Sequence, residues 1–363
     1  MKVFCAISGG VDSSVAAALL KRAGFDIVAV FMKLANLLSF TKNEQRARKI
    51  ASVLKIPFLS FDFREEFKKK IIDYFLKEYE EGTTPNPCVV CNKEIKFGLL
   101  LEKALALGAD YVATGHYVRI KTQNLKRKTQ NHNLKVKTYK LLKGEDKNKD
   151  QSYFLWQLNQ GQLKHILFPV GNYTKKQVRG LARRFKLPVL NINESQEICF
   201  IQTTIDDFLK HHLKTKSGKI INPQEKVVGK HLGLHFYTIG QRKGIKLSGG
   251  PFYVLDKDPK RNILVVTQNE KNLYKKELLA KNINWISGKE PKLPLKIKAK
   301  IRYRHQAATA IISSRSECKV YSLNFKVAQR AITPGQSVVF YSGNQILGGG
   351  TIEKITKKCN IKD

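Results

Sequence analysis

The sequence predicts an α/β protein with an N-terminal doubly wound parallel sheet, a small β-rich central domain and a C-terminal β-barrel. Apolar runs of strand length alternate with helical patterns through the first part of the chain, which is typical of a parallel sheet covered by helices. A Gly- and His-rich stretch with two short strands follows, and alternating strand-like segments fill the remainder. A chain of 363 residues suggests two or three domains. We place them at residues 1–215, 216–280 and 281–363.

The N-terminal part shows strand and helix patterns in turn. Strand-length apolar runs occupy residues 3–7, 27–32, 58–61 and 111–114. Helical patterns occupy residues 15–20, 44–54, 65–81 and 95–107. Because ligands of such sheets bind at the carboxyl ends of the strands, the loop at residue 8, Met32 and Gly115 should lie together at that edge.

The loop after the first strand is the most informative segment. It reads Ser-Gly-Gly-Val-Asp-Ser-Ser at residues 8–14 and leads into an alanine-rich helix. Glycines let a phosphate approach the backbone, and the first N–H groups of a helix lack internal partners, so this turn suits an anion. Asp12 could orient a magnesium ion on the same phosphates. No lysine follows the glycines, which excludes a Walker A loop. The alternative is a Gly-Ser turn without a chemical role.

The charge of the chain points to a polyanionic partner. The sequence has 66 Lys+Arg against 29 Asp+Glu, a formal net charge of +37. Nucleic acid is the first candidate, because each neutralised phosphate releases a counterion. A genome that favours lysine is the alternative. No run of 18 apolar residues occurs and residues 1–3 lead straight into a strand, so we expect no membrane span, no signal peptide and a cytoplasmic location.

The later segments predict architecture more than chemistry. Residues 121–149 are strongly basic and form either a hairpin or a mobile excursion; their charges are either a solvated run or a direct contact with RNA. Helical patterning returns over 151–185, where Thr174 is a plausible N-cap. The central domain should begin near Gly218 and contain strands at 252–255 and 263–266. The barrel strands are expected at residues 295–301, 309–312, 319–323, 337–341 and 346–355.

Two cysteine motifs carry the second chemical signal. Cys88 and Cys91 follow two prolines, and a helix that starts near Asn92 would direct its positive end at Cys91. We therefore predict a lowered pKa for the Cys91 thiol, with Lys93 and Lys96 adding positive charge. Cys199 lies in a third motif at residues 193–201. A single C-x-x-C is weak support for zinc, because a structural zinc site would need a second close pair.

Taken together, these motifs resemble the tRNA-specific 2-thiouridylases of the MnmA type, members of the N-type ATP pyrophosphatase (PP-loop) superfamily. The resemblance covers nearly the whole chain, and its motifs lie at residues 8–14, 31–33, 86–97, 114–117, 149–155, 198–200, 236–244, 302–304 and 334–336. It implies the PP-loop form of the nucleotide α-hydrolase-like sheet for the N-terminal domain. The central domain and the barrel would contact tRNA.

The resemblance also implies roles for particular residues. Cys91 would be the catalytic nucleophile, Cys199 the persulfide carrier, and Asp12 part of the catalytic ATP site. ATP would bind at Ala6, Ile7, Ser8, Gly9, Gly10, Val11, Asp12, Ser13, Met32 and Gly115. The target base would lie against Asn86, Pro87 and Cys88. The tRNA would contact His116, Lys149, Asp150, Gln151, Arg302, Tyr303 and Gln336.

The implied reaction has two stages and uses ATP with Mg²⁺. AMP is attached to the O2 side of the wobble uridine (position 34) of a Lys, Glu or Gln tRNA, and pyrophosphate leaves. A persulfide donor or relay protein loads Cys199. Cys91 then attacks that persulfide, which frees sulfur for C2 and leaves a Cys91–Cys199 disulfide. We expect a monomer that gives 2-thiouridine, AMP and pyrophosphate.

Two departures from the family pattern keep alternatives open. Many relatives have Asp at the position of Cys88, so Cys88, Cys91 and Cys199 could instead hold an iron–sulfur cluster with one open iron. The segment between Met32 and Glu44 is short and lacks acidic residues, which puts one wall of the nucleotide site in question. The competing functions are an AMP-transferring amidating synthetase and an RNA-binding module with an inactive nucleotide site.

Overall fold

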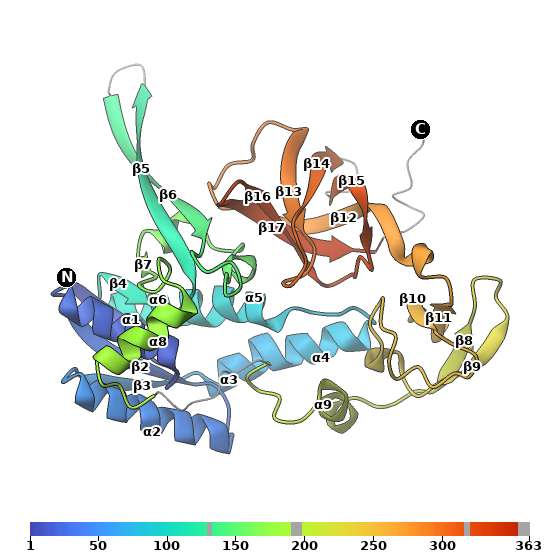
Figure 1. The fold of residues 1–363 in the computed structure, drawn as a ribbon, viewed down its shortest axis with the longest axis horizontal. Coiled ribbons are helices and arrows are strands. Elements are labelled where there is room, and N and C mark those ends of the chain that lie inside the picture. The colour runs from blue at the N-terminus through green and yellow to red at the C-terminus, as the bar shows by residue number, and fades with distance from the viewer. Residues whose placement is uncertain (129–132, 190–197, 316–319, 355–363) are drawn as a thin grey trace.

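A computed structural model describes residues 1–128, 133–189, 198–315 and 320–354 of the chain. Figure 1 shows a parallel sheet with its helices near the N-terminus, a β-barrel beside it and a small sheet between the lower helices and the barrel's far end. The predicted order of a doubly wound sheet, a small β-rich part and a barrel is confirmed. None of the helices in these ranges is long and apolar enough to cross a membrane.

The N-terminal sheet has five parallel strands in the order β3-β2-β1-β4-β7. They are β1 (Lys2–Ala6), β2 (Asp26–Lys33), β3 (Phe58–Asp62), β4 (Tyr111–Ala113) and β7 (Ile166–Leu167). The strand order reverses direction at β1, because β2 lies on one side of it and β4 on the other. A doubly wound sheet binds ligands at this switch point, so the loop that follows β1 is placed where a nucleotide is expected.

Helices cover both faces of this sheet. One face packs against α1 (Val11–Arg22), α2 (Leu38–Val53) and α8 (Lys175–Arg184). The other face packs against α3 (Arg64–Phe67), the π-helix η1 (Lys68–Ile72), α4 (Asp73–Glu80), α6 (Leu100–Ala106) and α9 (Ile205–His212). The predicted helix over 65–81 is therefore one rod with a π-helical turn at its centre. Shorter helices are α5 (Pro87–Cys91), η2 (Asn92–Leu99), η3 (Ser152–Phe154), α7 (Gln160–Leu163), η4 (Leu234–Phe236) and η5 (Glu270–Leu273).

The central part is a four-stranded sheet in the order β10-β11-β8-β9. Its strands are β8 (Gly218–Ile221), β9 (Val227–His231), β10 (Tyr253–Asp258) and β11 (Ile263–Thr267). A core of its own includes Ile220, Val254 and Leu264, none of which has exposed surface. The predicted start near Gly218 and both predicted strands agree with this sheet.

The C-terminal strands close into a barrel, because β12 pairs with both β15 and β17. The six strands are β12 (Tyr274–Trp285), β13 (Leu295–Lys300), β14 (Ala308–Arg315), β15 (Val320–Arg330), β16 (Ser337–Ser342) and β17 (Gln345–Glu353). Strand β12 is absent from the sequence-based expectation and runs across residue 281, where we placed a domain boundary. Its mixed burial leaves no clean alternation of apolar and polar residues to find.

A long hairpin connects the sheet domain to the barrel. Strands β5 (Val118–Lys128) and β6 (Asn133–Lys143) pair along their full length, so the predicted hairpin in this basic region is confirmed. Strand β6 also pairs with β17 of the barrel through Leu141 and Leu142. The sequence gives no sign of this bridge, since two backbone pairings carry no composition signal.

Candidate active site

The loop between β1 and α1 has the form of a phosphate cradle. Gly9 has φ +79°, and a Cβ there would lie 2.7 Å from the backbone oxygen of Asn43. The side chain of Ser13 folds back, accepting a hydrogen bond from the Ser8 backbone N–H at 3.2 Å and donating one to the Gly10 carbonyl at 3.1 Å. The N–H groups of the first turn of α1 therefore open into this loop at the positive end of the helix.

The segment after β4 completes the cradle. A Cβ on Gly115 would lie 2.6 Å from the backbone nitrogen of Ser13, so only glycine lets this segment approach α1 so closely. Met32 lies near the end of the neighbouring strand β2. The residues predicted from the motifs at 6–13, Met32 and Gly115 thus meet at one sheet edge, as expected for a doubly wound sheet.

Asp12 is held by two residues that the motif does not contain. The ammonium of Lys175 lies 2.7 and 2.8 Å from its two carboxylate oxygens, and the Tyr117 hydroxyl donates to one of them at 2.6 Å. Lys175 is the first residue of α8 and only 8% exposed. Its backbone N–H donates to Asp146 at 2.9 Å. No lysine follows the glycines in the sequence, but Lys175 of the distant helix α8 lies beside this loop.

Sequence reasoning found the cap of this helix but missed its lysine. The Thr174 side chain accepts from the backbone of Gln177 in a capping box, as predicted for an N-cap. One residue further on, Lys175 looks like any of the 66 basic residues of the chain. Only the packing of α8 against α1 turns it toward Asp12. Because the burial of Lys175 depends on packing between distant segments, the sequence carried no signal for it.

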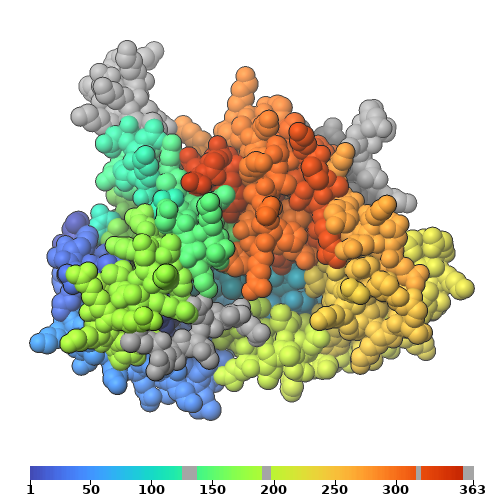
Figure 2. All heavy atoms as spheres, viewed as in Figure 1, coloured from blue at the N-terminus to red at the C-terminus, as the bar shows by residue number. Residues whose placement is uncertain are grey.

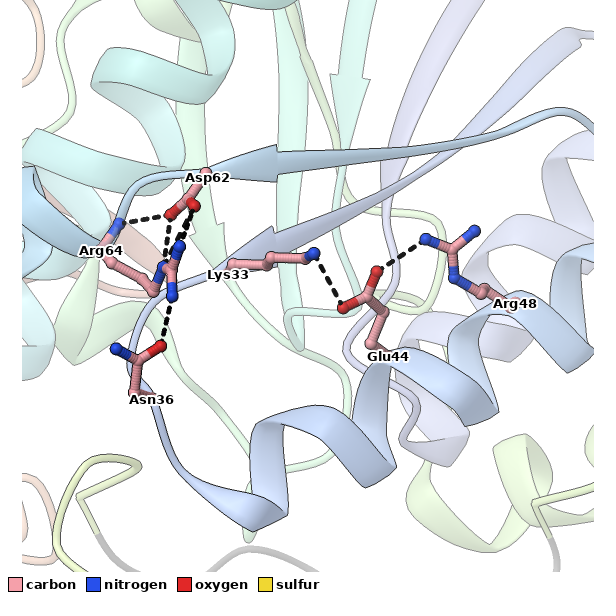
Figure 3. A network of polar contacts seen from close by, with 6 residues as sticks. All are labelled: Lys33, Asn36, Glu44, Arg48, Asp62 and Arg64. Atoms are coloured by element: carbon pink, nitrogen blue, oxygen red, sulfur yellow. Dashed lines mark hydrogen bonds and ion pairs between the residues drawn. The ribbon is translucent and has the colours of Figure 1, made fainter.

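The wall in question beside Met32 is built from charged residues on neighbouring elements (Figure 3). Glu44 of α2 pairs with Lys33 at 3.5 Å and with Arg48 at 2.8 Å. Hydrogen bonds from the Arg64 side chain lower the pKa of Asp62 to about 2. A cavity of about 590 Å³ opens here, lined by Leu34, Ala35, Asn36, Asp62, Arg64, Glu65, Glu66, Lys68 and Ile72. Acidic groups are thus present, but β3 and α2 supply them.

The prediction of a lowered pKa for Cys91 is wrong. The helix does not start at Asn92: α5 begins at Pro87 and continues directly into η2. Cys91 therefore lies in the interior of a helical rod and not at its positive end. Burial raises the pKa of its thiol to about 11, against a smaller lowering by the Lys96 charge. Cys91 is a neutral thiol at neutral pH in the protein without its substrates.

The three cysteines converge although they come from two distant segments. Desolvation by the surrounding protein, and then the charges of the neighbouring Cys91 and Cys88, raise the pKa of Cys199 to about 12. Solvent reaches the side chains of Cys88 and Cys199, while Cys91 is buried. Phe200 anchors the Cys199 segment by edge-to-face contacts with Phe67 and Phe75. The motif residues 193–197 lie outside the described part of the chain.

Lys96 and His116 border this cluster. The Lys96 charge acts on all three thiols and on His116. Burial, and then Lys96, lower the pKa of His116 well below its usual value, so its ring is neutral. The ring lies between Phe97 and Phe168 at centroid distances of 5.8 and 6.0 Å. His116 is 8% exposed, so little of its surface is available to a ligand.

The barrel holds the chain that leads to Cys88. The side-chain amide of Gln336 donates to the carbonyls of Thr84 at 2.9 Å and Pro85 at 3.2 Å. The Thr84 backbone N–H donates to Pro334 at 3.0 Å. Asn86 then caps α5, and Pro87 is its first residue. The predicted target-base residues and Gln336 are therefore neighbours in space.

Other predicted tRNA residues already have bonds within the protein. Arg302 donates to the carbonyls of Ile239 at 3.0 Å and Ala331 at 3.1 Å, which ties the segment after η4 to the barrel. Tyr303 packs on Phe154 with ring centroids 4.5 Å apart. Both lie partly exposed, so these contacts leave surface available for a ligand.

The loop at residues 149–151 is organised by its own side chains. Asp150 is buried and accepts hydrogen bonds from the backbone of Gly144 at 3.0 Å and Ser152 at 3.1 Å. The Gln151 side chain accepts from the Tyr117 backbone at 3.0 Å. Lys149 is half-buried beside them. The structure thus places this loop against Tyr117 and the ATP loop.

The sequence matches three family models in the same order as the three structural parts. They are described as a tRNA methyl transferase HUP domain over residues 1–203, a tRNA methyl transferase PRC-barrel domain over 206–268 and an aminomethyltransferase beta-barrel domain over 275–352. The fold and the loop after β1 thus define a HUP-type, PP-loop protein of the class that uses ATP.

Curated relatives give the particular family. The chain is 45% identical over 353 residues to the tRNA-specific 2-thiouridylase MnmA of Syntrophomonas wolfei subsp. wolfei, covering 97% of this chain and 100% of that protein. It is 44% identical over 367 residues to the protein of the same name from Clostridioides difficile, covering 97% and 98%. It is 40% identical to that of Geobacillus thermodenitrificans, covering 98% and 95%. The chain belongs to the MnmA family of tRNA sulfurtransferases.

Proposed function

We propose that this protein thiolates C2 of the wobble uridine, position 34, of tRNAs of the Lys, Glu and Gln type. The reaction consumes ATP and gives 2-thiouridine, AMP and pyrophosphate. The observation that carries the proposal is that Cys91 and Cys199, which come from distant segments, lie near enough to act on each other electrostatically, in the domain that also holds the phosphate loop. An amidating synthetase would need the phosphate loop but not the cysteines.

The ATP loop performs the first stage. The N–H groups that open α1 bind phosphate oxygens, and Lys175 adds a positive charge beside them. The O2 of the uracil attacks the α-phosphorus of ATP, and the bond to the β-phosphate oxygen breaks as pyrophosphate leaves. Asp12 offers carboxylate oxygens of the kind that Mg²⁺ prefers, and Mg²⁺ bound there would neutralise phosphate charge. Lys175 occupies those oxygens in this structure and can turn to the phosphates when ATP binds.

The cysteines perform the second stage. Cys199 carries the transferred sulfur as a persulfide, delivered by a persulfide donor protein. The Cys91 thiolate attacks the inner sulfur of this persulfide; a Cys91–Cys199 disulfide forms and hydrosulfide leaves. The hydrosulfide attacks C2 of the adenylated uracil, and the C2–O bond breaks to release AMP. A thiol reductant supplies the two electrons that reopen the disulfide.

The Cys91 thiol must lose its proton for this step, although its pKa is about 11. The ammonium of Lys96 is the positive charge that already favours the thiolate of all three cysteines. Solvent-accessible Cys199 can be loaded from outside, while buried Cys91 is shielded from the donor. This difference in exposure supports Cys199 as the carrier and Cys91 as the resolving thiol.

An iron–sulfur route would use Cys88 together with the other two thiols. Three thiolates are a suitable donor set for a cluster with one open iron. Over the described ranges, however, no group of three or more His, Cys, Asp or Glu side chains is arranged to hold a metal ion. No step of the proposed reaction passes through iron.

The proposal is tested with anaerobically purified protein, unmodified tRNA, ATP, magnesium and a persulfide donor. Nucleosides from the tRNA are analysed by mass spectrometry, and iron is quantified in the same protein. New 2-thiouridine with sub-stoichiometric iron is the expected result. One iron cluster per chain together with 2-thiouridine would move the mechanism to Cys88, Cys91 and Cys199. Pyrophosphate release without 2-thiouridine would overturn the assigned base or tRNA.

A further inference from the structure

The hairpin β5–β6 is unusually basic. Residues 118–143 contain nine Lys or Arg and no Asp or Glu: Arg119, Lys121, Lys126, Arg127, Lys128, Lys135, Lys137, Lys140 and Lys143. Neither the phosphate loop nor the cysteine site uses any of them. The paired backbones of residues 118–128 and 133–143 hold these basic positions in a fixed register.

The ribbon reaches well beyond the body of the protein. Its two strands pair in register from Val118 with Lys143 to Lys128 with Asn133. Eleven residues per strand at about 3.3 Å each give a ribbon roughly 35 Å long. Figure 1 shows β5 and β6 rising away from the parallel sheet, and Figure 2 shows the lower part of the ribbon (green) beside the barrel (orange and red).

The base of the ribbon is firmly anchored, so its direction is fixed. Val118 and Leu141 have no exposed surface. The Gln160 side chain pairs with the Tyr139 backbone in both directions, at 2.8 and 2.9 Å. Strand β6 joins the barrel through β17. The outer ribbon is therefore carried on a rigid support shared by two domains.

The charges of the outer ribbon oppose its own folding. Lys121 pairs in register with Lys140. Like charges directly opposite in a ladder are destabilising, and a two-stranded ribbon is marginal in water to begin with. At the base, by contrast, Arg119 is neutralised by Glu145 at 2.9 Å. Among the described residues no carboxylate pairs with Lys121, Lys137 or Lys140, so a polyanion is the partner that this arrangement fits.

The position of the ribbon indicates which polyanion it binds. Strand β5 starts two residues after His116, and the chain continues from β6 through Gly144 to Lys149. His116 and Lys149 are both expected tRNA contacts. Tyr117, next to β5, holds Asp12 of the ATP loop at 2.6 Å. The ribbon thus starts at the reaction site and extends away from it. RNA that has its target base at the cysteines would place the adjoining nucleotides along the ribbon.

We propose that β5–β6 is an RNA-binding arm that contacts backbone phosphates of the double-helical stem next to the target base. The proposal rests on the proposed function, because it takes tRNA as the substrate. Double-stranded RNA is bound mainly through its shape, phosphates and 2′-hydroxyls. The arm therefore adds affinity without reading sequence, and its contribution falls as salt rises.

The test compares two triple variants with equal loss of charge. The arm variant is Lys121→Gln, Lys137→Gln and Lys140→Gln. The matched control is Lys42→Gln, Lys49→Gln and Lys55→Gln, three exposed lysines on and just after α2, away from the arm. A shortened arm, in which Asn-Gly replaces residues 124–137, keeps the anchored base and closes the hairpin with a favoured turn. Thermal unfolding verifies that all three fold.

Dissociation constants for tRNA are measured at 50 and 200 mM salt. Each phosphate contact changes the affinity over this range by roughly threefold, so the wild-type affinity should fall about 30-fold more than that of the arm variant. The α2 variant should behave as the wild type, and the shortened arm should match or exceed the effect of the arm variant. Equal salt dependence of the arm and α2 variants would overturn the proposal.

Thiolation activity is the second readout. It distinguishes an RNA-binding arm from an arm that docks the persulfide donor, and it distinguishes failure of this proposal from failure of the proposed function. If the arm variant binds tRNA normally but loses thiolation only with a protein persulfide donor, and not with a small-molecule persulfide, the arm docks the donor and the RNA proposal is wrong. If the wild type makes no 2-thiouridine while its tRNA affinity still depends on the arm, the proposed function fails and the arm stands.

Discussion

The phosphate loop and the cysteine site are assembled in different ways. The loop is formed by consecutive residues between β1 and α1, and its internal hydrogen bonds join Ser8, Gly10 and Ser13. The cysteine site joins α5 to the segment around Phe200, and the barrel holds the approach through Gln336. ATP binding is therefore a local property of one domain, whereas sulfur transfer depends on the docking of several segments.

The largest expected effect separates the two sites completely. Cys199→Ser should lower thiolation by at least about 10³-fold, because the sulfur carrier is lost, and should leave tRNA-dependent pyrophosphate release unchanged. Both products are measured in the same reaction. Cys88→Ser is the matched control and should retain thiolation within about tenfold. Full thiolation by Cys199→Ser would show that Cys199 is not the persulfide carrier.

Substitution of Lys175 tests the phosphate loop, the other site of the comparison. Lys175→Met removes the charge beside Asp12 and should slow pyrophosphate release by roughly 10² to 10³-fold, the usual scale for loss of one charge that stabilises a transition state. Lys176→Met, at the next and exposed position of α8, should have no effect. Equal rates for the two variants would mean that Lys175 serves only to pack α8.

The raised pKa of Cys91 predicts a pH dependence. With a pKa of about 11, its thiolate fraction rises tenfold with each pH unit from 7 to 10, and the rate of alkylation should rise in step. Peptide mass spectrometry in the Cys88→Ser background reports this rate. Lys96→Met should raise the pKa of Cys91 further and slow alkylation at each pH, whereas Lys93→Met, whose ammonium pairs with Glu94 at 3.5 Å, should change it less. A rate independent of pH above 8 would contradict the raised pKa.

The smallest expected effect concerns docking of the barrel. Gln336→Ala removes two hydrogen bonds to the chain before Cys88, worth about 1 kcal/mol each, and should slow thiolation by at most about 30-fold with pyrophosphate release intact. Gln329→Ala, near the end of the preceding strand β15, is the control. An equal loss in both activities would show that the barrel supports the ATP loop as well.

The features that could be predicted from the sequence are the locally encoded ones, and those that depend on the packing of distant segments could not be. The loop at 8–14 and the alternation of strands and helices are encoded locally, in glycines and in periodic apolar residues, and the sequence sufficed for them. Lys175 and β12 were missed, because the burial of a lysine and the closure of a barrel depend on packing between distant segments. The pKa of Cys91 was assigned in the wrong direction, since one error in the start of a helix moved it from an exposed terminus to a buried interior.

The central claim is that Cys199 delivers sulfur and Cys91 resolves the persulfide. It is tested most directly by a single turnover of persulfide-loaded protein with ATP and tRNA in the absence of reductant. The reaction is followed by blocking of free thiols and peptide mass spectrometry. The account predicts a Cys91–Cys199 disulfide that appears in step with 2-thiouridine, with Cys88 still a free thiol. Formation of 2-thiouridine with Cys91 and Cys199 both unlinked would contradict it.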